Sequence, residues 1–269
     1  MKKVLSFALV SLMLVLALTG CATTVKTNNE EASLAIACEL TSEEYGIGFR
    51  KGSDLTAVVN DYIAELEADG TLAALAEKYD LALSDLAPAE EEEVTLADVD
   101  YVKANGKLII GITDYEPMNY KDAEDKWTGF DTEFAEAVCE KLGVAAEFVE
   151  IDWDNKFVAL ESKAIDCIWN GMTISEDVLK NTSCSAAYVK NAQVVVMAAD
   201  KAADYADAES MKDLSFAAES GSAGAAAAEE CGFANLTEVG TQTDALLEVT
   251  SGSCDACIID LTMANAMVK

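Results

Sequence analysis

The stretch Gly111–Leu142, GITDYEPMNYKDAEDKWTGFDTEFAEAVCEKL, decides how the rest of the chain is interpreted. It follows the apolar run Leu108–Ile110, which predicts a buried strand of a parallel sheet. An aromatic and acidic loop comes next, and Asp131 or Thr132 is the expected cap of a helix that ends at Gly143. In open α/β sheets, the loop between a strand and its helix lies where ligands bind.

The start of this helix carries a resemblance. The segments Gly129–Phe134 and Val138–Leu142 are similar to the signature of extracellular solute-binding proteins of polar amino-acid ABC transporters. This resemblance implies an α/β fold of the type II periplasmic-binding-protein class, with two lobes, mainly parallel sheets and a hinge. It also implies a non-enzymatic protein that captures an amino acid or similar small polar solute between the lobes and delivers it to a permease.

The N-terminus has the pattern of a lipoprotein signal peptide. A basic start precedes the apolar run Val4–Leu18, which is too short and wrongly flanked to be a stable membrane span. The box Leu18–Cys21 resembles a lipoprotein processing site; the alternative is a plain secretory peptide. We expect removal of residues 1–20, lipid on Cys21 and a tether over 21–32. The mature protein is then extracytoplasmic and anchored to the cell membrane.

Composition excludes several function classes. The formal net charge of −31 argues against nucleic-acid binding, and the absence of histidine removes histidine-based catalysis and most zinc sites. We therefore expect no cofactor and no metal ion. We also expect a monomer. Cys139, Cys167 and Cys257 fall at expected core positions, and the spacing of Cys254 and Cys257 is interpreted as packing rather than redox or metal chemistry.

The order of the elements differs from the order that the resemblance implies. The segment Tyr45–Leu81 resembles the end of a family member, yet it precedes the strand at Leu108–Ile112 that resembles the beginning. We infer a circular permutation; a truncated tandem of two binding proteins and an assembly artefact are the alternatives. The expected parts are lobe 1 at 45–197 (family C-terminal part 45–80, linker 81–106, family N-terminal part 107–197) and lobe 2 at 33–44 plus 198–269.

Short apolar runs between polar turns predict the remaining strands. They are Leu34–Ala37, Tyr45–Arg50, Glu147–Ile151, Ile165–Trp169, Val194–Met197 and Leu214–Ala218.

A free amino acid needs a carboxylate for its ammonium group, N–H donors for its carboxylate and walls for its side chain. By resemblance, Asp260 takes the ammonium position, although a helix cap is its simpler role. Tyr115 and Trp153 match the two aromatic walls, with core packing as the alternative. Asp114 is placed to read a polar or cationic side chain of the ligand.

The remaining candidates match segments that surround the ligand carboxylate in the family. They are Asn170, Gly171 and Thr173 on one lobe and the hydroxyl of Ser222 on the other.

One departure bears on the ligand. The family pattern carries an arginine that forks onto the ligand carboxylate, and this chain has Val178 there. One interpretation is that backbone groups and the hydroxyls of Thr173 and Ser222, or a lysine such as Lys156 or Lys190, replace this arginine. The other interpretation is that the ligand is not a standard α-amino acid.

Two further functions stay open. One is a small-acid dehydratase-like enzyme using Asp114 and Glu116, and the other is a solute-sensing module with a separate signalling partner.

Overall fold

The computed structural model describes residues 33–85, 93–205 and 207–268. The expected signal peptide, Cys21, the tether and part of the expected linker lie outside the described residues. Among the described helices, none is long and apolar enough to cross a bilayer.

Strands and helices alternate along most of the described chain. The strands are β1 (Leu34–Arg50), β2 (Lys107–Ile112), β3 (Tyr120–Lys121), β4 (Trp127–Thr128), β5 (Ala145–Glu150), β6 (Cys167–Thr173), β7 (Thr182–Cys184), β8 (Val189–Ala198), β9 (Ser215–Glu219), β10 (Asn235–Val239) and β11 (Ala256–Asp260). The α-helices are α1 (Leu55–Ala68), α2 (Thr71–Lys78), α3 (Asp98–Asn105), α4 (Phe130–Leu142), α5 (Lys156–Glu161), α6 (Glu176–Asn181), α7 (Ala199–Ala202), α8 (Ala223–Cys231), α9 (Gln242–Thr250) and α10 (Leu261–Met267). Two 3₁₀ turns, η1 (Trp153–Asn155) and η2 (Ala208–Met211), complete the set.

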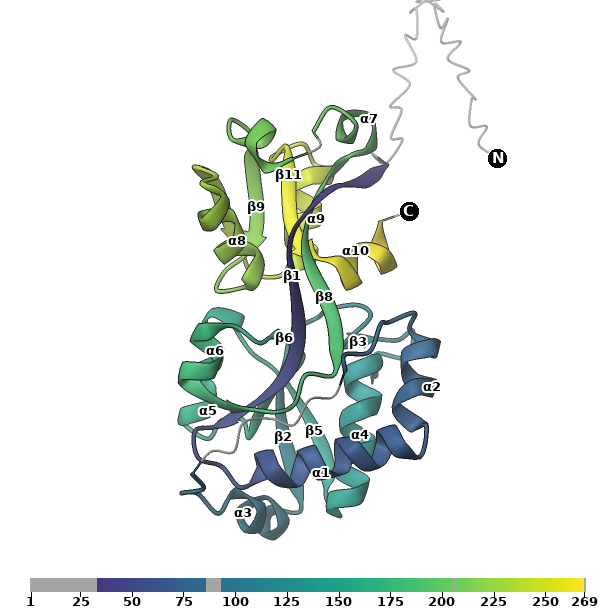
Figure 1. The fold of residues 1–269 in the computed structure, drawn as a ribbon, viewed down its shortest axis with the longest axis vertical. Coiled ribbons are helices and arrows are strands. Elements are labelled where there is room, and N and C mark those ends of the chain that lie inside the picture. The colour runs from purple at the N-terminus through teal and green to yellow at the C-terminus, as the bar shows by residue number, and fades with distance from the viewer. Residues whose placement is uncertain (1–32, 86–92, 206, 269) are drawn as a thin grey trace, which may run out of the picture. The chain divides into compact units, whose positions relative to one another are not determined.

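The main sheet of the described residues has the order β10-β9-β11-β8-β1-β6-β2-β5, with β7 paired to β1, and β3 and β4 form a separate two-stranded sheet. Pairing is parallel at both ends, where β9 lies between β10 and β11 and β2 lies between β5 and β6. In the middle, β8 and β1 pair antiparallel with each other and with their outer neighbours. Figure 1 shows β1 and β8 side by side, connecting the two parallel regions. The expected α/β class is confirmed, with one continuous sheet and an antiparallel centre.

The two strands expected at Leu34–Ala37 and Tyr45–Arg50 form a single strand, β1. The sequence between them is polar and has no strand-like alternation, but it pairs with β8 almost throughout, with two register shifts. The end of β1, from Tyr45 to Phe49, pairs with β6, and β6 pairs with β2. This is the neighbourhood that a permuted order requires for Tyr45–Arg50; the permutation itself stays a prediction.

The expected cap of α4 is wrong. Gly129 occupies the N-cap position without a side-chain hydrogen bond, whereas the buried carboxylate of Asp131 accepts from Gly171 N–H at 2.6 Å and from Tyr188 O–H at 3.0 Å. Thr132 donates its hydroxyl to the Thr128 carbonyl. The Asp131 side chain therefore fastens α4 to β6 and to Tyr188, just before β8, whereas Thr132 bonds back to β4.

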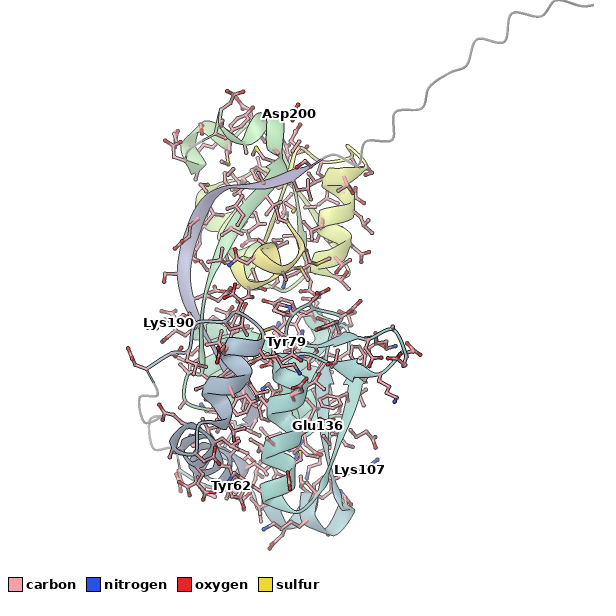
Figure 2. All side chains as sticks on the ribbon, turned by 90° about the vertical axis from the view of Figure 1, so that its right-hand side faces the viewer. Tyr62, Tyr79, Lys107, Glu136, Lys190 and Asp200 are labelled. Atoms are coloured by element: carbon pink, nitrogen blue, oxygen red, sulfur yellow. The ribbon has the colours of Figure 1, made fainter. Side chains whose placement is uncertain are left out.

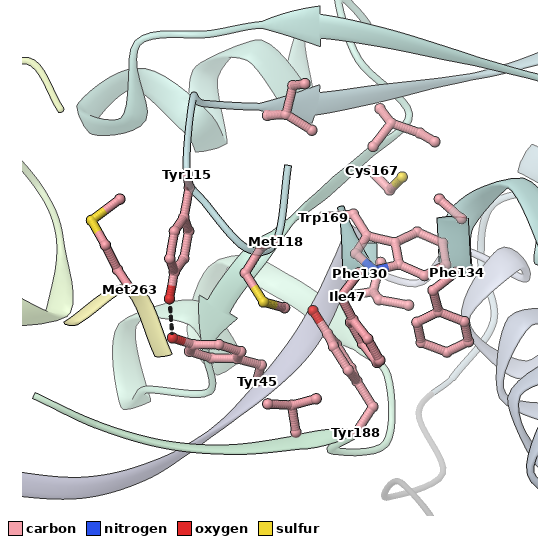
Figure 3. Close-up of a cluster of buried hydrophobic side chains, with 14 of the residues drawn as sticks. Tyr45, Ile47, Tyr115, Met118, Phe130, Phe134, Cys167, Trp169, Tyr188 and Met263 are labelled. Atoms are coloured by element: carbon pink, nitrogen blue, oxygen red, sulfur yellow. Dashed lines mark hydrogen bonds between the residues drawn. The ribbon is translucent and has the colours of Figure 1, made fainter. Parts of the chain in front are cut away.

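Aromatic side chains form the centre of the core beside α4. Phe130 stacks on Tyr188, and Phe134 packs edge-on against Trp169 with ring centroids 5.1 Å apart. Figure 3 shows these four rings in the core. Tyr79, at the end of α2, donates a hydrogen bond to Glu133 on α4; Figure 2 shows Tyr79 beside that helix. The segment that resembles a family C-terminus thus packs directly on the segment that resembles its beginning.

A buried ion cluster fastens the same region. Arg50 donates to Asp98 at 3.0 Å and to Asp166 at 3.1 Å, and it also donates to the Ile165 carbonyl at 2.9 Å. Asp98 opens α3, a helix within the stretch expected as a solvated linker. Burial of all three charged groups makes their mutual pairing obligatory, because an isolated charge there would be costly.

Candidate functional site

A pocket of about 490 Å³ lies between the β1–β6 side of the sheet and the β9–β11 side. Six of the predicted ligand-binding residues line it: Trp153, Asn170, Gly171, Thr173, Ser222 and Asp260. They come together because β6 and β11 both deliver polar side chains at their ends, while the turns before α5 and α8 supply the rest. No cluster of three or more potential metal ligands occurs in the described part of the chain.

Asp260, at the end of β11, is the acid among these six residues, and 5% of its surface is exposed. Its carboxylate accepts from Asn191 Nδ2 at 2.6 Å and from Gln193 Nε2 at 2.7 Å, and Gln242 is a third amide donor. It occupies the N-cap position of α10 but makes no side-chain capping bond. Burial, and then the nearby charge of Glu43, raise the pKa of Asp260 to about 7.

Glu43 lines the pocket and was not among the predicted residues. Its Oε1 accepts from Asn191 at 2.6 Å, from Gln193 at 2.8 Å and from the Thr173 hydroxyl at 2.8 Å. The amides of Asn191 and Gln193 therefore bridge two carboxylates, one on β1 and one on β11. Glu43 reaches the pocket because β1 continues through this polar segment by pairing with β8. The segment itself has no strand pattern, so its sequence did not predict this position.

Glu219 ends β9 and is the second acid that sequence reasoning missed. It is 3% exposed and lines the pocket, and its Oε1 has no hydrogen-bond partner among the described residues. Burial, and then the charge of Asp260, raise the pKa of Glu219 to about 8. An apolar run followed by glutamate and a Ser-Gly turn is the sequence pattern that would have identified it.

Lys156 is the one lysine of the described pocket lining, and it contacts the turn that follows β9. Its ammonium group donates to the Trp153 carbonyl at 3.2 Å and to the Gly221 carbonyl at 2.8 Å. It also lies 5.0 Å from the ring centroid of Trp153 and 4.9 Å from that of Phe157. Burial lowers the pKa of Lys156. The other proposed replacement, Lys190, is exposed and does not line this pocket.

Val178 lines the pocket at the position where the resemblance implies an arginine. It is 4% exposed and belongs to an apolar cluster with Trp153 and Met172. Its main-chain N–H donates to the Ser175 hydroxyl, which caps α6. The wall that would hold a guanidinium is therefore apolar here.

Tyr115 and Asp114 do not line the pocket. The Tyr115 hydroxyl lies 2.5 Å from that of Tyr45 and 2.5 Å from Thr262 Oγ1, at the end of a buried ring (Figure 3). The ring still lies directly behind Gly171, where an added Cβ would come within 2.7 Å of it. Asp114 is exposed. Their assignment as ligand contacts stays a prediction.

The Ser222 hydroxyl accepts from Ala225 N–H at 3.2 Å and so caps α8. Gly221 precedes it with a φ of +67°, and an added Cβ there would lie 2.7 Å from Asp154 Oδ1. Glycine is therefore required for the close approach between this turn and the turn before α5.

The fold and this pocket define an α/β solute-binding protein. The chain belongs to the bacterial extracellular solute-binding proteins, family 3, whose model matches residues 108–264. The resemblance in the Gly129–Leu142 segment is thereby confirmed.

Two of the relatives have names that describe amino-acid binding. The L-cystine-binding protein TcyJ of Escherichia coli (strain K12) is 36% identical over 88 residues, covering 32% of this chain and 33% of TcyJ. The arginine-binding extracellular protein ArtP of Bacillus subtilis (strain 168) is 31% identical over 171 residues, covering 61% of this chain and 64% of ArtP. The chain thus spans about a third of the first relative and less than two thirds of the second.

A solved structure supports the fold. The crystal structure of the ancestral amino acid-binding protein AncCDT-1, a precursor of cyclohexadienyl dehydratase, matches with a TM-score of 0.61 and 30% identity. The match covers 63% of this chain and 77% of that one.

Proposed function

We propose that this chain is the substrate-binding component of an ABC importer, which captures an amino acid or similar small polar solute in the pocket and delivers it to a permease. Membership of the solute-binding family and the amino-acid-binding relatives support this role. The observation that carries it is Asp260, a buried carboxylate held by three amide donors at the wall of the pocket. Such a preorganised acceptor suits an ammonium group.

Ligand binding is testable without knowing the ligand in advance. A thermal-shift panel of amino acids, amines and small peptides should contain at least one member that stabilises the protein. The expected gain is about 2.7 kcal/mol at a ligand concentration of 100 Kd, because the ligand binds only the folded state. Failure of every member, followed by failure of calorimetry with the same solutes, would contradict the proposal.

The same proposal includes a lipid anchor on Cys21 and action as a monomer outside the cytoplasm. The signal pattern at residues 1–21 supports the anchor. Expression with a Cys21→Ser change should abolish lipid modification, detected as loss of the lipid mass from the intact protein.

Association with a permease is tested by co-purification from membranes and by ligand-dependent stimulation of the transporter's ATPase. Size-exclusion with light scattering tests the monomer.

The enzymatic alternative, a small-acid dehydratase, has a weaker basis. AncCDT-1 is named as a precursor of a dehydratase, and a carboxyl group with a pKa near neutrality suits a general acid. However, Asp114 and Glu116, the acids first considered for this role, do not line the pocket, and its acidic lining disfavours an anionic substrate. Detection of an elimination product by NMR would support the enzymatic alternative.

The third alternative is the solute-sensing module. A pull-down that retrieves a sensor in place of a permease would favour it.

A further inference from the structure

The pocket lining is strongly acidic. Among the described residues, its charged side chains are one lysine, Lys156, and eight acids: Glu43, Asp154, Asp177, Glu219, Glu229, Glu230, Glu238 and Asp260. Charges of one sign in a concave site raise the local concentration of ligands of the opposite sign. The field of this pocket therefore favours a cation, and it opposes a free carboxylate wherever no positive group compensates.

The lysine adds one positive charge, but most of its N–H donors are committed to other partners. Its ammonium group already donates to two main-chain carbonyls, those of Trp153 and Gly221, and lies over two aromatic rings. An ammonium has three protons, so these contacts use most of its donors. The position that resembles the carboxylate-binding arginine is Val178, packed in an apolar cluster. A ligand carboxylate would thus meet neither an arginine nor an uncommitted lysine in the described lining.

The acids, in contrast, retain unused acceptor capacity. Glu219 is 3% exposed, yet its Oε1 has no partner among the described residues. A buried polar atom without a partner is costly, and its presence at a pocket wall marks a place for a missing donor. Glu43 on β1 and Asp260 on β11 are fixed by shared amides, with their lone pairs only partly used. One pocket therefore holds two separate places for positively charged donors.

We propose that the ligand is an organic amine or guanidine cation that lacks an α-carboxylate, such as a diamine, rather than a zwitterionic α-amino acid. One cationic end binds the Glu43–Asp260 pair, and Glu219 receives a second N–H group. The alkyl stem packs on apolar lining residues, among them Met172, Val178 and Ala226. This inference rests on the proposed solute-binding function and specifies its substrate class.

A zwitterionic ligand is the competing possibility. Its carboxylate would have to rely on main-chain N–H groups at the start of α8. Ser222 N–H already donates to the Glu219 carbonyl, and Ala225 N–H donates to the Ser222 hydroxyl. The remaining N–H groups lie close in sequence to Glu219, and its carboxylate repels a ligand carboxylate once it is ionised. At pH 8, where Glu219 is partly ionised, that complex would place the ligand carboxylate near this acid, with Lys156 as the one positive group of the described lining, which is unfavourable at low dielectric.

Matched ligand pairs test the inference directly. Calorimetry of the full chain at pH 8 compares agmatine with L-arginine, cadaverine with L-lysine, and putrescine with L-ornithine. Each pair differs only by the α-carboxylate. We expect at least one amine to bind ten-fold or more tightly than its amino acid. An amino acid that binds as tightly as its amine, or a neutral amino acid that binds better than all amines, would overturn the inference while leaving the solute-binding function intact. Failure of all solutes would overturn both.

Two variants locate the effect. Glu219→Gln should weaken amine binding ten-fold or more, because a neutral amide replaces the charged acceptor. Glu136→Gln, the same change at an exposed acid on α4 (Figure 2), is the control and should leave Kd unchanged. Val178→Arg should shift preference toward the amino acid of each pair. Should that variant fail to fold, Glu219→Gln decides alone: unchanged amine affinity would overturn the assignment of Glu219 as a ligand group.

Discussion

Glu43 and Asp260, which lie on strands far apart in the sequence, share the same two amide donors, Asn191 and Gln193. All four donor–acceptor distances lie between 2.6 and 2.8 Å. Because Glu43 lies close enough to raise the pKa of Asp260, ionisation of both groups is unfavourable without a cation at this wall of the pocket. The β1–β8 strand pair delivers both amides and Glu43, so sheet continuity is what builds this part of the site.

Removal of one shared amide should destabilise the protein. Gln193→Met keeps the side-chain length but deletes a donor to both carboxylates, and Gln193 is buried. We expect a loss of about 1.5–3 kcal/mol in the free energy of unfolding, the usual worth of a hydrogen bond to a charged group. Urea denaturation measures it, and a double-mutant cycle with Glu43→Gln isolates the pair. A coupling energy indistinguishable from zero would show that the Glu43–Gln193 bond contributes nothing.

Asp260→Asn should abolish tight ligand binding without unfolding the chain. The amide has the same shape as the carboxylate but carries no charge for a cationic group. We expect Kd to rise by a factor that corresponds to about 2–5 kcal/mol, as for removal of one partner from a buried charge pair. Calorimetry with the best ligand measures it. Retained affinity would remove Asp260 from the site and with it the observation on which the proposed function depends.

The ligand-free protein should lose stability as pH rises. Burial raises the pKa of Glu219 to about 8 and that of Asp260 to about 7, and Asp131 also reaches about 7. Between pH 4 and these values the folded state binds protons that the unfolded state has already released, so the free energy of unfolding falls. The slope is at most about 1.4 kcal/mol per pH unit for each group.

Urea midpoints at pH 5, 6, 7 and 8 measure this dependence. Lys156 opposes the rise in the pKa of Glu219, whereas Asp260, Asp152 and Asp244 reinforce it. The Glu219→Gln variant should therefore have a flatter profile than the parent protein. A stability that increases from pH 5 to pH 8 would contradict the assignment. A bound cation should reduce the slope, because it favours the ionised carboxylates.

How far the sequence predicts the site depends on where each residue's neighbours come from. Asp260 was predictable because a polar residue at the end of an apolar strand is a local pattern. Glu43 was not, since its segment has no strand pattern and becomes a strand only by pairing with β8. The same holds for Tyr115, whose hydroxyl partners Tyr45 and Thr262 lie 70 and 147 residues away.

Helix and strand positions followed local periodicity more closely. The predicted strand at Leu108–Ile110 is the centre of β2, and Gly143 ends α4 with a φ of +79° as expected. Cys139, Cys167 and Cys257 are buried free thiols, as their positions in apolar patterns predicted. The α4 cap was wrong because Asp131 resembles a capping residue locally but bonds to Gly171 across the fold.

Tyr115→Phe distinguishes a structural from a ligand-binding role. The change removes the hydroxyl contacts with Tyr45 and Thr262 and keeps the ring. We expect a loss of about 1 kcal/mol in unfolding free energy for each lost bond and little change in Kd. Trp153→Ala, by comparison, removes a pocket wall and should weaken binding strongly. If the two variants lost affinity equally, Tyr115 would belong to the ligand site after all.

A variant with the family order restored tests the inferred permutation. It places residues 33–80 after Lys269 through a flexible Gly-Ser linker and opens the chain within 81–106. The contacts of β1, α1 and α2 do not depend on which ends are joined, so we expect a Kd within about two-fold of the parent value. Stability should rise by about 1 kcal/mol, the scale on which loop closure entropy changes with connection length. Equal stability would show that the permuted order carries no cost. A variant that neither folds nor binds would favour a truncated tandem, because Tyr45–Leu81 would then belong with a second copy rather than with β6 and α4.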